Sequence, residues 1–267
     1  MPDTLFFAHA NGFPAGTYGP MLAKLATAFC VQYLPQHGHD PSFPVEDNWA
    51  LLVDELLQAI RIQPTPVWGV GHSLGGLLHL HAALRHPELY KGLVLLDSPL
   101  LTRRDQWLIH AAKRLGLIDH ITPAGRTQGR RERFASHEEA RRYFADKALF
   151  RPFTPECLEA YLEHGLVAEG QAWRLAFEPD IELRIYRSVP HVSPSPPHLL
   201  TLPLALLCGK ASTVVRRHHA RYVSRLARGE FHSVPGGHLF PMEHPLETAE
   251  QVLAVLRRWQ EGASHHG

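Results

Sequence analysis

The sequence predicts an α/β fold, with a six-stranded, mainly parallel sheet covered by helices on both faces and interrupted by one helical insertion. Apolar runs of strand length alternate with longer segments whose apolar residues follow the helical period, which is typical of strands joined by crossover helices. The alternation breaks once, between about residues 100 and 198, and strand-like sequence returns at residue 203. A chain of 267 residues is long enough for one large hydrophobic core.

Each element of the sheet is predicted from its own segment. The six predicted strands, in chain order, cover residues 4–10, 30–35, 66–72, 92–98, 203–209 and 230–236. The helices between and after them are predicted over residues 18–29, 46–62, 74–86, 215–228 and 245–260. In the last helix, Pro245 lies in the first turn, acidic residues come early and arginines come late, which agrees with proline and helix-dipole preferences.

The insertion reads as helical throughout, and a cluster of prolines ends it. We interpret it as an addition to one continuous core formed by residues 1–99 and 199–267, rather than as a second free-standing domain. Its arginines are interleaved with glutamates, which favours a solvated, salt-bridged surface, with anion binding as the alternative. These arginines are Arg126, Arg130, Arg131, Arg133, Arg141 and Arg142.

Composition and charge exclude several classes of partner. The formal net charge is +1, so nothing indicates binding to nucleic acid or to an anionic membrane surface. No apolar run reaches the roughly 18 residues that a membrane-spanning helix needs. The start of the chain enters a core strand without a basic segment or a cleavage site, so we expect no secretory leader and a cytoplasmic protein.

Cysteine and histidine are spaced in ways that do not favour a disulfide framework or a metal site. Cys30, Cys157 and Cys208 are odd in number and far apart, which predicts free thiols. The histidines number 20, but their close pairs are one or two residues apart, which does not place two rings on one helix face. No His-x-x-x-His with a companion acid occurs, so we expect no metal ion and no cofactor.

One short motif carries chemical information. Gly71-His72-Ser73-Leu74-Gly75 follows an apolar strand and opens an apolar helix. A sharp strand-turn-helix of this kind thrusts the serine out of the sheet, and the flanking glycines let strand and helix approach closely. The N-terminus of the helix also favours negative charge that develops beside the serine. The alternative is that Ser73 is an ordinary N-cap residue of that helix.

Three motifs in chain order make the sequence resemble an α/β-hydrolase. "FFAHANGFP" resembles the loop after the first core strand, "GHSLGG" the turn that carries the nucleophile, and "VPGGHLFPMEHP" the histidine loop. The resemblance covers essentially the whole chain. It implies a six-stranded parallel core, and it implies that residues 100–198 form the helical lid that follows the strand after the nucleophile in this family.

The resemblance also implies roles for individual residues. Ser73 corresponds to the nucleophile and His238 to the base that activates it. One oxyanion-hole donor is the backbone N–H of Leu74, and the second comes from the loop between His9 and Pro14. Here "HANGFP" is two residues longer than the usual H-G-x-P, so Asn11 and Phe13 both remain candidates. His72 and His9 are expected to be structural.

The acid of the triad is not where most of the family has it. The segment after the next-to-last strand reads "LLCGKASTVV", in which Ser212 and Thr213 cannot carry the charge. Some relatives take the acid from the end of the strand after the nucleophile, and that strand ends here in Asp97. Glu178 and Asp180 in the insertion are rivals. In the alternative role, Asp97 only caps a turn, together with its neighbour Ser98.

The function predicted from these residues is that of a serine hydrolase, which splits a carboxylic ester, a thioester, a lactone or a related bond through an acyl-enzyme. Its substrate is expected to be a small molecule with an apolar acyl or aromatic part, because the insertion is rich in aromatic residues such as Trp107 and Phe144. Carbon–carbon bond hydrolases and cofactor-free perhydrolases use the same triad on the same fold and remain alternatives. A further alternative is a non-catalytic relative that binds a small ligand.

Overall fold

The computed structural model describes residues 2–193, 200–226 and 228–264. Its main sheet has six strands in the order β2-β1-β3-β4-β8-β9, and every neighbouring pair is parallel. The predicted sheet is therefore confirmed. The strands are β1 (Thr4–Ala8), β2 (Cys30–Tyr33), β3 (Val67–His72), β4 (Tyr90–Leu96), β8 (Leu204–Gly209) and β9 (Gly229–Val234).

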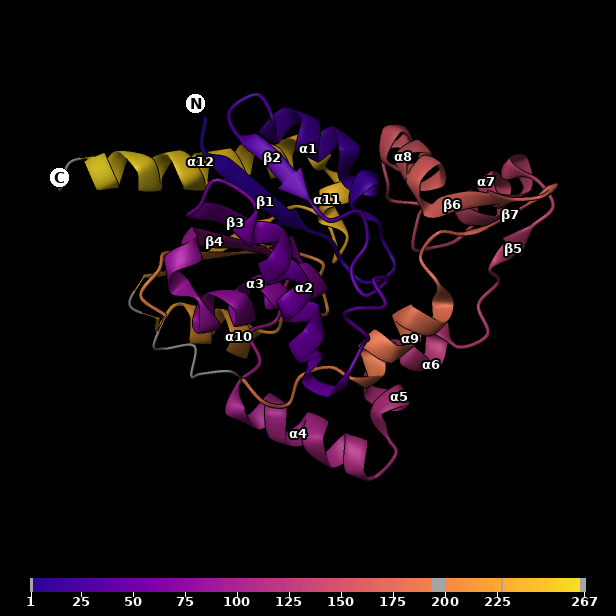
Figure 1. The fold of residues 1–267 in the computed structure, drawn as a ribbon, viewed down its shortest axis with the longest axis horizontal. Coiled ribbons are helices and arrows are strands. Elements are labelled where there is room, and N and C mark those ends of the chain that lie inside the picture. The colour runs from indigo at the N-terminus through magenta and orange to yellow at the C-terminus, as the bar shows by residue number, and fades with distance from the viewer. Residues whose placement is uncertain (1, 194–199, 227, 265–267) are drawn as a thin grey trace.

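Helices cover both faces of this sheet. Successive strand residues point to opposite sides, so each strand presents apolar side chains to both layers of helices. Leu5 and Phe7 of β1 pack with α1 (Gly19–Leu25), α11 (Phe240–Glu243) and α12 (Pro245–Ser264). Phe6 and Ala8 pack on the other side, with α2 (Ala50–Arg61), α3 (Leu74–Arg85) and the region of α10 (Arg217–Val223). Figure 1 shows α1 and α12 together on one side of the sheet. The short 3-10 helices are η1 (Ala15–Tyr18), η2 (Asp47–Trp49) and η3 (Pro87–Leu89).

The parallel order brings the candidate residues to one edge of the sheet. Carboxyl ends of parallel strands meet at the same edge, and ligands bind there in open α/β sheets. His9 follows β1, Ser73 follows β3 and Asp97 follows β4. The loops after β8 and β9 begin at this edge too, and His238 lies in the second of them.

Residues between β4 and β8 form a mixed structure, so the prediction of a wholly helical insertion was wrong. Besides its helices, the segment contains a three-stranded antiparallel sheet in the order β5-β7-β6. Gly170, with φ of 63°, stands in the two-residue connection from β6 to β7, a typical hairpin turn position. The elements are α4 (Arg103–Arg114), α5 (Ile118–Ile121), α6 (Ala124–Thr127), β5 (Arg133–Phe134), α7 (His137–Ala145), α8 (Pro155–Gly165), β6 (Leu166–Glu169), β7 (Ala172–Leu175) and α9 (Pro179–Arg187).

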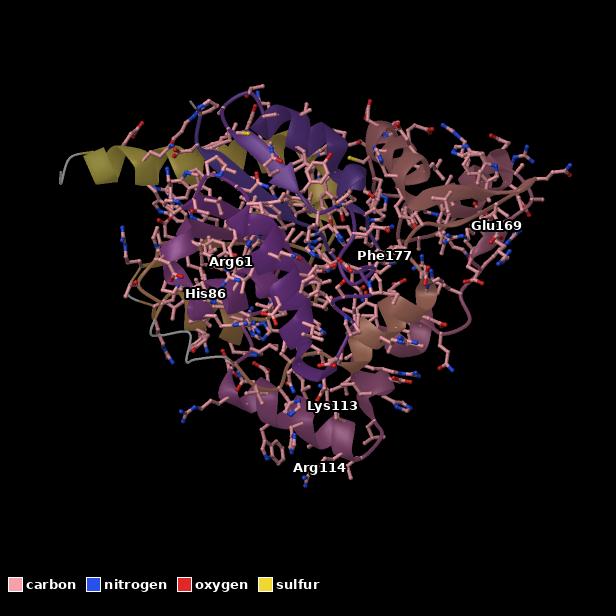
Figure 2. The ribbon with its side chains drawn as sticks, viewed as in Figure 1. Arg61, His86, Lys113, Arg114, Glu169 and Phe177 are labelled. Atoms are coloured by element: carbon pink, nitrogen blue, oxygen red, sulfur yellow. The ribbon has the colours of Figure 1, made fainter. Side chains whose placement is uncertain are left out.

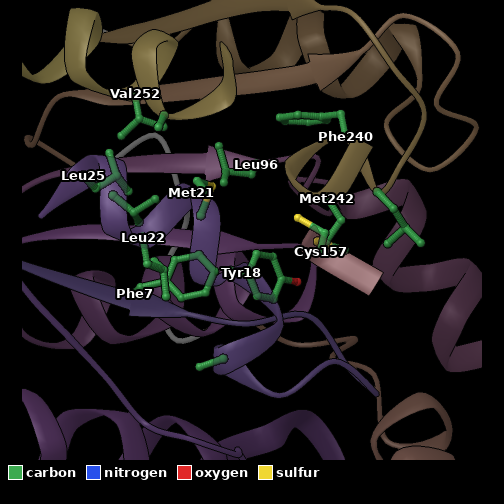
Figure 3. Close-up of a cluster of buried hydrophobic side chains, with 14 of the residues drawn as sticks. Phe7, Tyr18, Met21, Leu22, Leu25, Leu96, Cys157, Phe240, Met242 and Val252 are labelled. Atoms are coloured by element: carbon green, nitrogen blue, oxygen red, sulfur yellow. The ribbon is translucent and has the colours of Figure 1, made fainter. Parts of the chain in front are cut away.

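This segment shares its core with the main sheet. Cys157 of α8 lies in the same apolar cluster as Phe7 and Met21 (Figure 3). Phe177 lies between the segment and the sheet (Figure 2), with its ring 5.9 Å from that of His9. Trp107 instead points into solvent, with 67% of its surface exposed. The prolines at residues 194–199, where the insertion was expected to end, lie outside the described residues.

Five of the six arginines named for this segment form ion pairs with glutamates, as the interleaved sequence predicted, and Arg126 forms none with the described residues. Four of these pairs lie at the surface, on α7, on β5 and just before β5: Arg131–Glu139, Arg133–Glu169, Arg141–Glu159 and Arg142–Glu138. Exposed pairs of this kind contribute about 0–1 kcal/mol each to stability.

The three cysteines are all free, with Cys30 exposed and the other two buried, which agrees with the sequence prediction. Within the described part of the chain, no helix combines the length and the apolar character needed to cross a membrane.

Candidate active site

Ser73 lies on a strained turn between β3 and α3. Its backbone has φ of 51° and ψ of −110°, outside the regions that side-chain-bearing residues usually adopt. A Cβ on Gly71 would lie 2.4 Å from the carbonyl carbon of Gly75, and a Cβ on Gly75 would lie 2.1 Å from the Ala8 oxygen. Both glycines are therefore required by close backbone contact. The Ser73 side chain makes no capping hydrogen bond to α3, so the N-cap interpretation does not explain it.

His238 and Asp97 are in direct contact. Nδ1 of His238 lies 2.7 Å from Oδ2 of Asp97, whose side chain is fully buried. The carboxylate also accepts the Gly209 N–H at 3.1 Å and the Ser212 hydroxyl at 2.5 Å. Burial raises the pKa of Asp97, but the hydrogen bonds from His238 and Ser212 outweigh it, and the pKa lies below its usual value. An ionised Asp97 holds the proton of neutral His238 on Nδ1 and leaves Nε2 free to accept.

The other candidate acids lie elsewhere. Glu178 and Asp180 flank the start of α9, are exposed, and line a separate surface cavity together with Arg133 and Arg174. Ser212 occupies the place after β8 where an acid was expected, and its hydroxyl contacts the acid from β4 instead. The sequence alone gave no signal for this hydrogen bond, because residues 97 and 212 are far apart in the chain.

A buried hydrogen-bond chain joins the three loops of the site. Ala10 N–H donates to the Tyr18 hydroxyl at 3.2 Å, so the hydroxyl proton is left for Nδ1 of His72 at 2.7 Å. Nε2 of His72 then carries a proton and donates to the carbonyl oxygen of His238 at 2.9 Å. Burial, followed by the charge of nearby His238, lowers the pKa of His72 to about 3, so its ring is neutral at neutral pH. The predicted structural role of His72 therefore has a definite form, and Tyr18 is its partner.

The loop after β1 is also fixed by hydrogen bonds. His9 contacts the Ala10 oxygen through Nδ1 at 2.8 Å, and its Nε2 accepts the His37 N–H at 2.9 Å. Burial lowers the pKa of His9 well below its usual value, so the ring is neutral. Phe13 N–H donates to the Ala10 oxygen at 3.2 Å and closes a turn through Asn11 and Gly12. His9 thus stabilises the loop, as expected from the sequence.

A buried ion pair lies directly behind this turn. The carboxylate of Glu182 would be 2.9 Å from a Cβ on Gly12, and the Glu182 carbonyl oxygen accepts Nδ2 of Asn11 at 3.0 Å. Nη1 of Arg130 lies 2.5 Å from the carboxylate. Burial raises the pKa of Glu182, whereas the charge of Arg130 opposes that rise. The ion pair supports the turn from behind, and Arg130 offsets the negative charge of the Glu182 carboxylate beside the turn.

One group of side chains could approach a metal ion. The ligand atoms of Asp105, His218 and His219 lie within 4.8 Å of one another, where the N-terminus of α4 meets α10. Nδ1 of His219 accepts the Arg216 N–H at 3.1 Å, so a neutral ring carries its proton on Nε2. A protonated nitrogen cannot bind a metal. Nε2 of His218 lies 3.1 Å from the Asp105 carboxylate, which also closes the capping box of α4, and this contact explains the group better than a metal ion does.

A parallel sheet with a serine on a strained strand-to-helix turn, and with a histidine–carboxylate pair at the same edge, defines the class of α/β-hydrolases. Residues 5–251 match the alpha/beta hydrolase family, and the chain belongs to that family.

Curated relatives resemble part of the chain. A pimeloyl-[acyl-carrier protein] methyl ester esterase of Chromobacterium violaceum is 40% identical over 109 residues, which is 40% of this chain and 41% of that protein. A putative carbamate hydrolase RutD of Pantoea ananatis is 34% identical over 102 residues, 36% of each chain. The chain thus matches about two-fifths of the length of these relatives.

Solved structures show the same fold over nearly the whole chain. E-2-(acetamidomethylene)succinate hydrolase superposes with a TM-score of 0.74 and 20% identity, covering 96% of this chain and 91% of that one. The M. tuberculosis esterase Rv0045c superposes with a TM-score of 0.71 and 22% identity, covering 96% and 86% of the two chains.

Proposed function

We propose that the chain is a serine hydrolase that cleaves a carboxylic ester through an acyl-enzyme, with Ser73, His238 and Asp97 as its catalytic triad. The observation that carries this proposal is the 2.7 Å contact between His238 and the buried Asp97, at the sheet edge where Ser73 is held on its strained turn. The second support is resemblance, since the relative from C. violaceum is named as a methyl ester esterase.

In this mechanism Ser73 Oγ attacks the ester carbonyl while His238 Nε2 accepts its proton. Asp97 stabilises the imidazolium that forms. Collapse of the tetrahedral intermediate breaks the bond to the alkoxy group, which leaves as an alcohol with the proton from His238. Water then attacks the acyl-enzyme by the same route. No hydrogen bond joins the Ser73 hydroxyl to His238 in the described structure, and such contacts often tighten only when substrate is bound.

The negative oxygen of each intermediate needs two N–H donors. Leu74 is the first residue of α3, so its N–H has no partner within the helix. Of the two candidates in the loop after β1, we assign the second donor to Asn11. The N–H of Phe13 is engaged with the Ala10 oxygen, whereas the turn leaves that of Asn11 without an intraloop partner.

We assign residues 100–198 as a lid that shapes the acyl pocket. Rings of this segment surround Phe13, which follows the proposed donor in the loop, at centroid distances of 6.0 Å for Phe150, 6.2 Å for Phe153 and 5.7 Å for Tyr161. We propose that this buried aromatic cluster borders the acyl site, where it would favour an apolar acyl chain over a charged one.

Hydrolysis of p-nitrophenyl esters from acetate to octanoate tests this function. We expect turnover of the whole series, with kcat/KM rising by about tenfold or more from the acetate to a medium-length chain, because each buried methylene adds binding free energy. Absence of turnover, with saturable binding of the same esters, would instead support a non-catalytic ligand-binding relative. Turnover restricted to activated carbon–carbon substrates would support the C–C hydrolase alternative.

Tyr18→Phe tests the hydrogen-bond chain behind the triad. The variant keeps the ring in its buried position but leaves the Ala10 N–H and Nδ1 of His72 without their partner. We expect kcat to fall about tenfold to a hundredfold with KM little changed, because the donor loop and the His238 loop lose their common anchor. Tyr33→Phe, at an exposed residue of β2, is the matched control and should keep full activity. An unchanged kcat in Tyr18→Phe would mean that this series of hydrogen bonds only stabilises the fold.

A further inference from the structure

Residues 210–228 form a strongly basic stretch between β8 and β9. The sequence KASTVVRRHHARYVSRLAR contains six lysines and arginines and no acidic residue. The whole chain has 27 basic and 26 acidic residues, so the rest of the molecule is net negative. The excess of positive charge therefore lies in the stretch that contains α10, whose place in the fold is labelled in Figure 1.

Unlike Arg141 and Arg142 of α7, four of these basic residues have no acidic partner within the described part of the chain. Lys210, Arg216, Arg217 and Arg221 form no ion pair with any carboxylate among residues 2–193, 200–226 and 228–264. The acid that contacts α10 is Asp105, and it is directed at His218 and His219 instead. Four like charges close together repel one another, and an anion bound between them would remove that repulsion.

These same four residues line a cavity of about 710 Å³ between α10 and the edge strand β9. Phe231, with 38% of its surface exposed, and Val215 supply apolar surface to the cavity. In the loop after β8 the Thr213 hydroxyl supplies a further donor, whereas the Ser212 hydroxyl is engaged with Asp97, and no carboxylate of the described residues lines the cavity. Small-molecule sites typically enclose about 300–1,000 Å³ and combine apolar walls with a few polar groups.

We propose that this cavity binds a phosphorylated small molecule, with Arg216, Arg217 and Arg221 holding the phosphate. Guanidinium groups match the geometry and charge of phosphate by paired hydrogen bonds. The exposed ring of Phe231 is placed to contact an apolar or aromatic body attached to that phosphate. A cavity lined by residues of one helix, one loop and the ends of two strands is too small for a standard protein interface, which buries about 800 Å² per partner.

The cavity is next to the triad but separate from Ser73. Ser212 lines it and also donates to the buried Asp97, so one residue lies between the proposed phosphate site and the acid. Binding at this site does not depend on the proposed ester hydrolysis. It can be measured in Ser73→Ala protein, so failure of one proposal is distinguishable from failure of the other.

Calorimetric titration with sodium pyrophosphate, at constant ionic strength set with sodium chloride, tests the site. We expect saturable binding to a single site of the full chain. The double variant Arg216→Gln/Arg217→Gln should weaken that binding by about tenfold or more, since each charged hydrogen bond contributes roughly a tenfold factor. Both side chains are exposed, so the fold should be retained. Arg221→Gln gives a second, independent variant with the same expected direction.

Arg141→Gln/Arg142→Gln is the matched control, because it removes the same charge from a surface where both arginines are paired with glutamate. It should bind pyrophosphate within about twofold of the parent protein, well short of the loss expected for charged hydrogen bonds. Equal weakening in both double variants would show that only net charge matters and would overturn the proposal. Absence of saturable pyrophosphate binding would overturn it too. Binding of poly-L-glutamate without pyrophosphate binding would identify an acidic-polypeptide surface instead.

Discussion

Ser73→Ala is expected to lower kcat for ester hydrolysis on the order of 10⁶-fold, the loss that follows removal of the serine in another serine hydrolase. Alanine lacks the oxygen that forms the acyl-enzyme, and no other serine hydroxyl is described at the strained turn after β3. The same change should abolish covalent labelling by a fluorophosphonate probe. Intact-protein mass spectrometry would show one added group on the parent protein and none on the variant.

Ser98→Ala is the control for this experiment. Ser98 is buried beside the site, where its hydroxyl donates to the Leu96 oxygen at 3.2 Å and lies next to Gly76. It should retain labelling and activity within about tenfold, since it loses one ordinary hydrogen bond. Full activity in Ser73→Ala would refute the serine-hydrolase proposal, and labelling of the variant would identify a different nucleophile.

The main sheet could be predicted from the sequence because its strands are apolar runs of the right length between helical segments. The ends of the strands were predicted less accurately. β4 was predicted over residues 92–98 but ends at Leu96, because Asp97 has φ of 45°, which no strand residue adopts. That same departure from extended backbone turns the Asp97 carboxylate toward β8 and the histidine loop.

Sequence reasoning could not find the partners that complete the site, because their contacts depend on tertiary packing. Ser212 meets Asp97 across 115 positions of the chain, and Tyr18 meets His72 across 54. Neither pair has a spacing that repeats in helices or strands.

The small antiparallel sheet was missed for a different reason. Its strands are only two to four residues long, too short for a period of two to stand out from the helical pattern around them.

The buried environment of Asp97 explains why an amide could not replace it. Three donors converge on its two oxygens: the Gly209 N–H on Oδ1, and the Ser212 hydroxyl and His238 Nδ1 on Oδ2. An asparagine offers one acceptor oxygen and one NH₂ group. If the oxygen stays with the fixed Gly209 N–H, the NH₂ group faces His238, and Nδ1 must then accept a hydrogen bond. The ring proton would move to Nε2, where the base has to be free.

Asp97→Asn is therefore expected to lower kcat by about 10⁴, as neutralising the triad acid does in a serine protease, with the fold and the Ser73 turn intact. The measurement is kcat for a p-nitrophenyl ester, with the thermal unfolding midpoint as a check on folding. Ser212→Ala removes one donor but keeps the charge, so its loss should be only about tenfold to a hundredfold. Glu178→Gln and Asp180→Asn, at the exposed rivals, should leave kcat unchanged. A normal kcat in Asp97→Asn together with a large loss in either rival variant would place the acid in the insertion and contradict the role of Asp97.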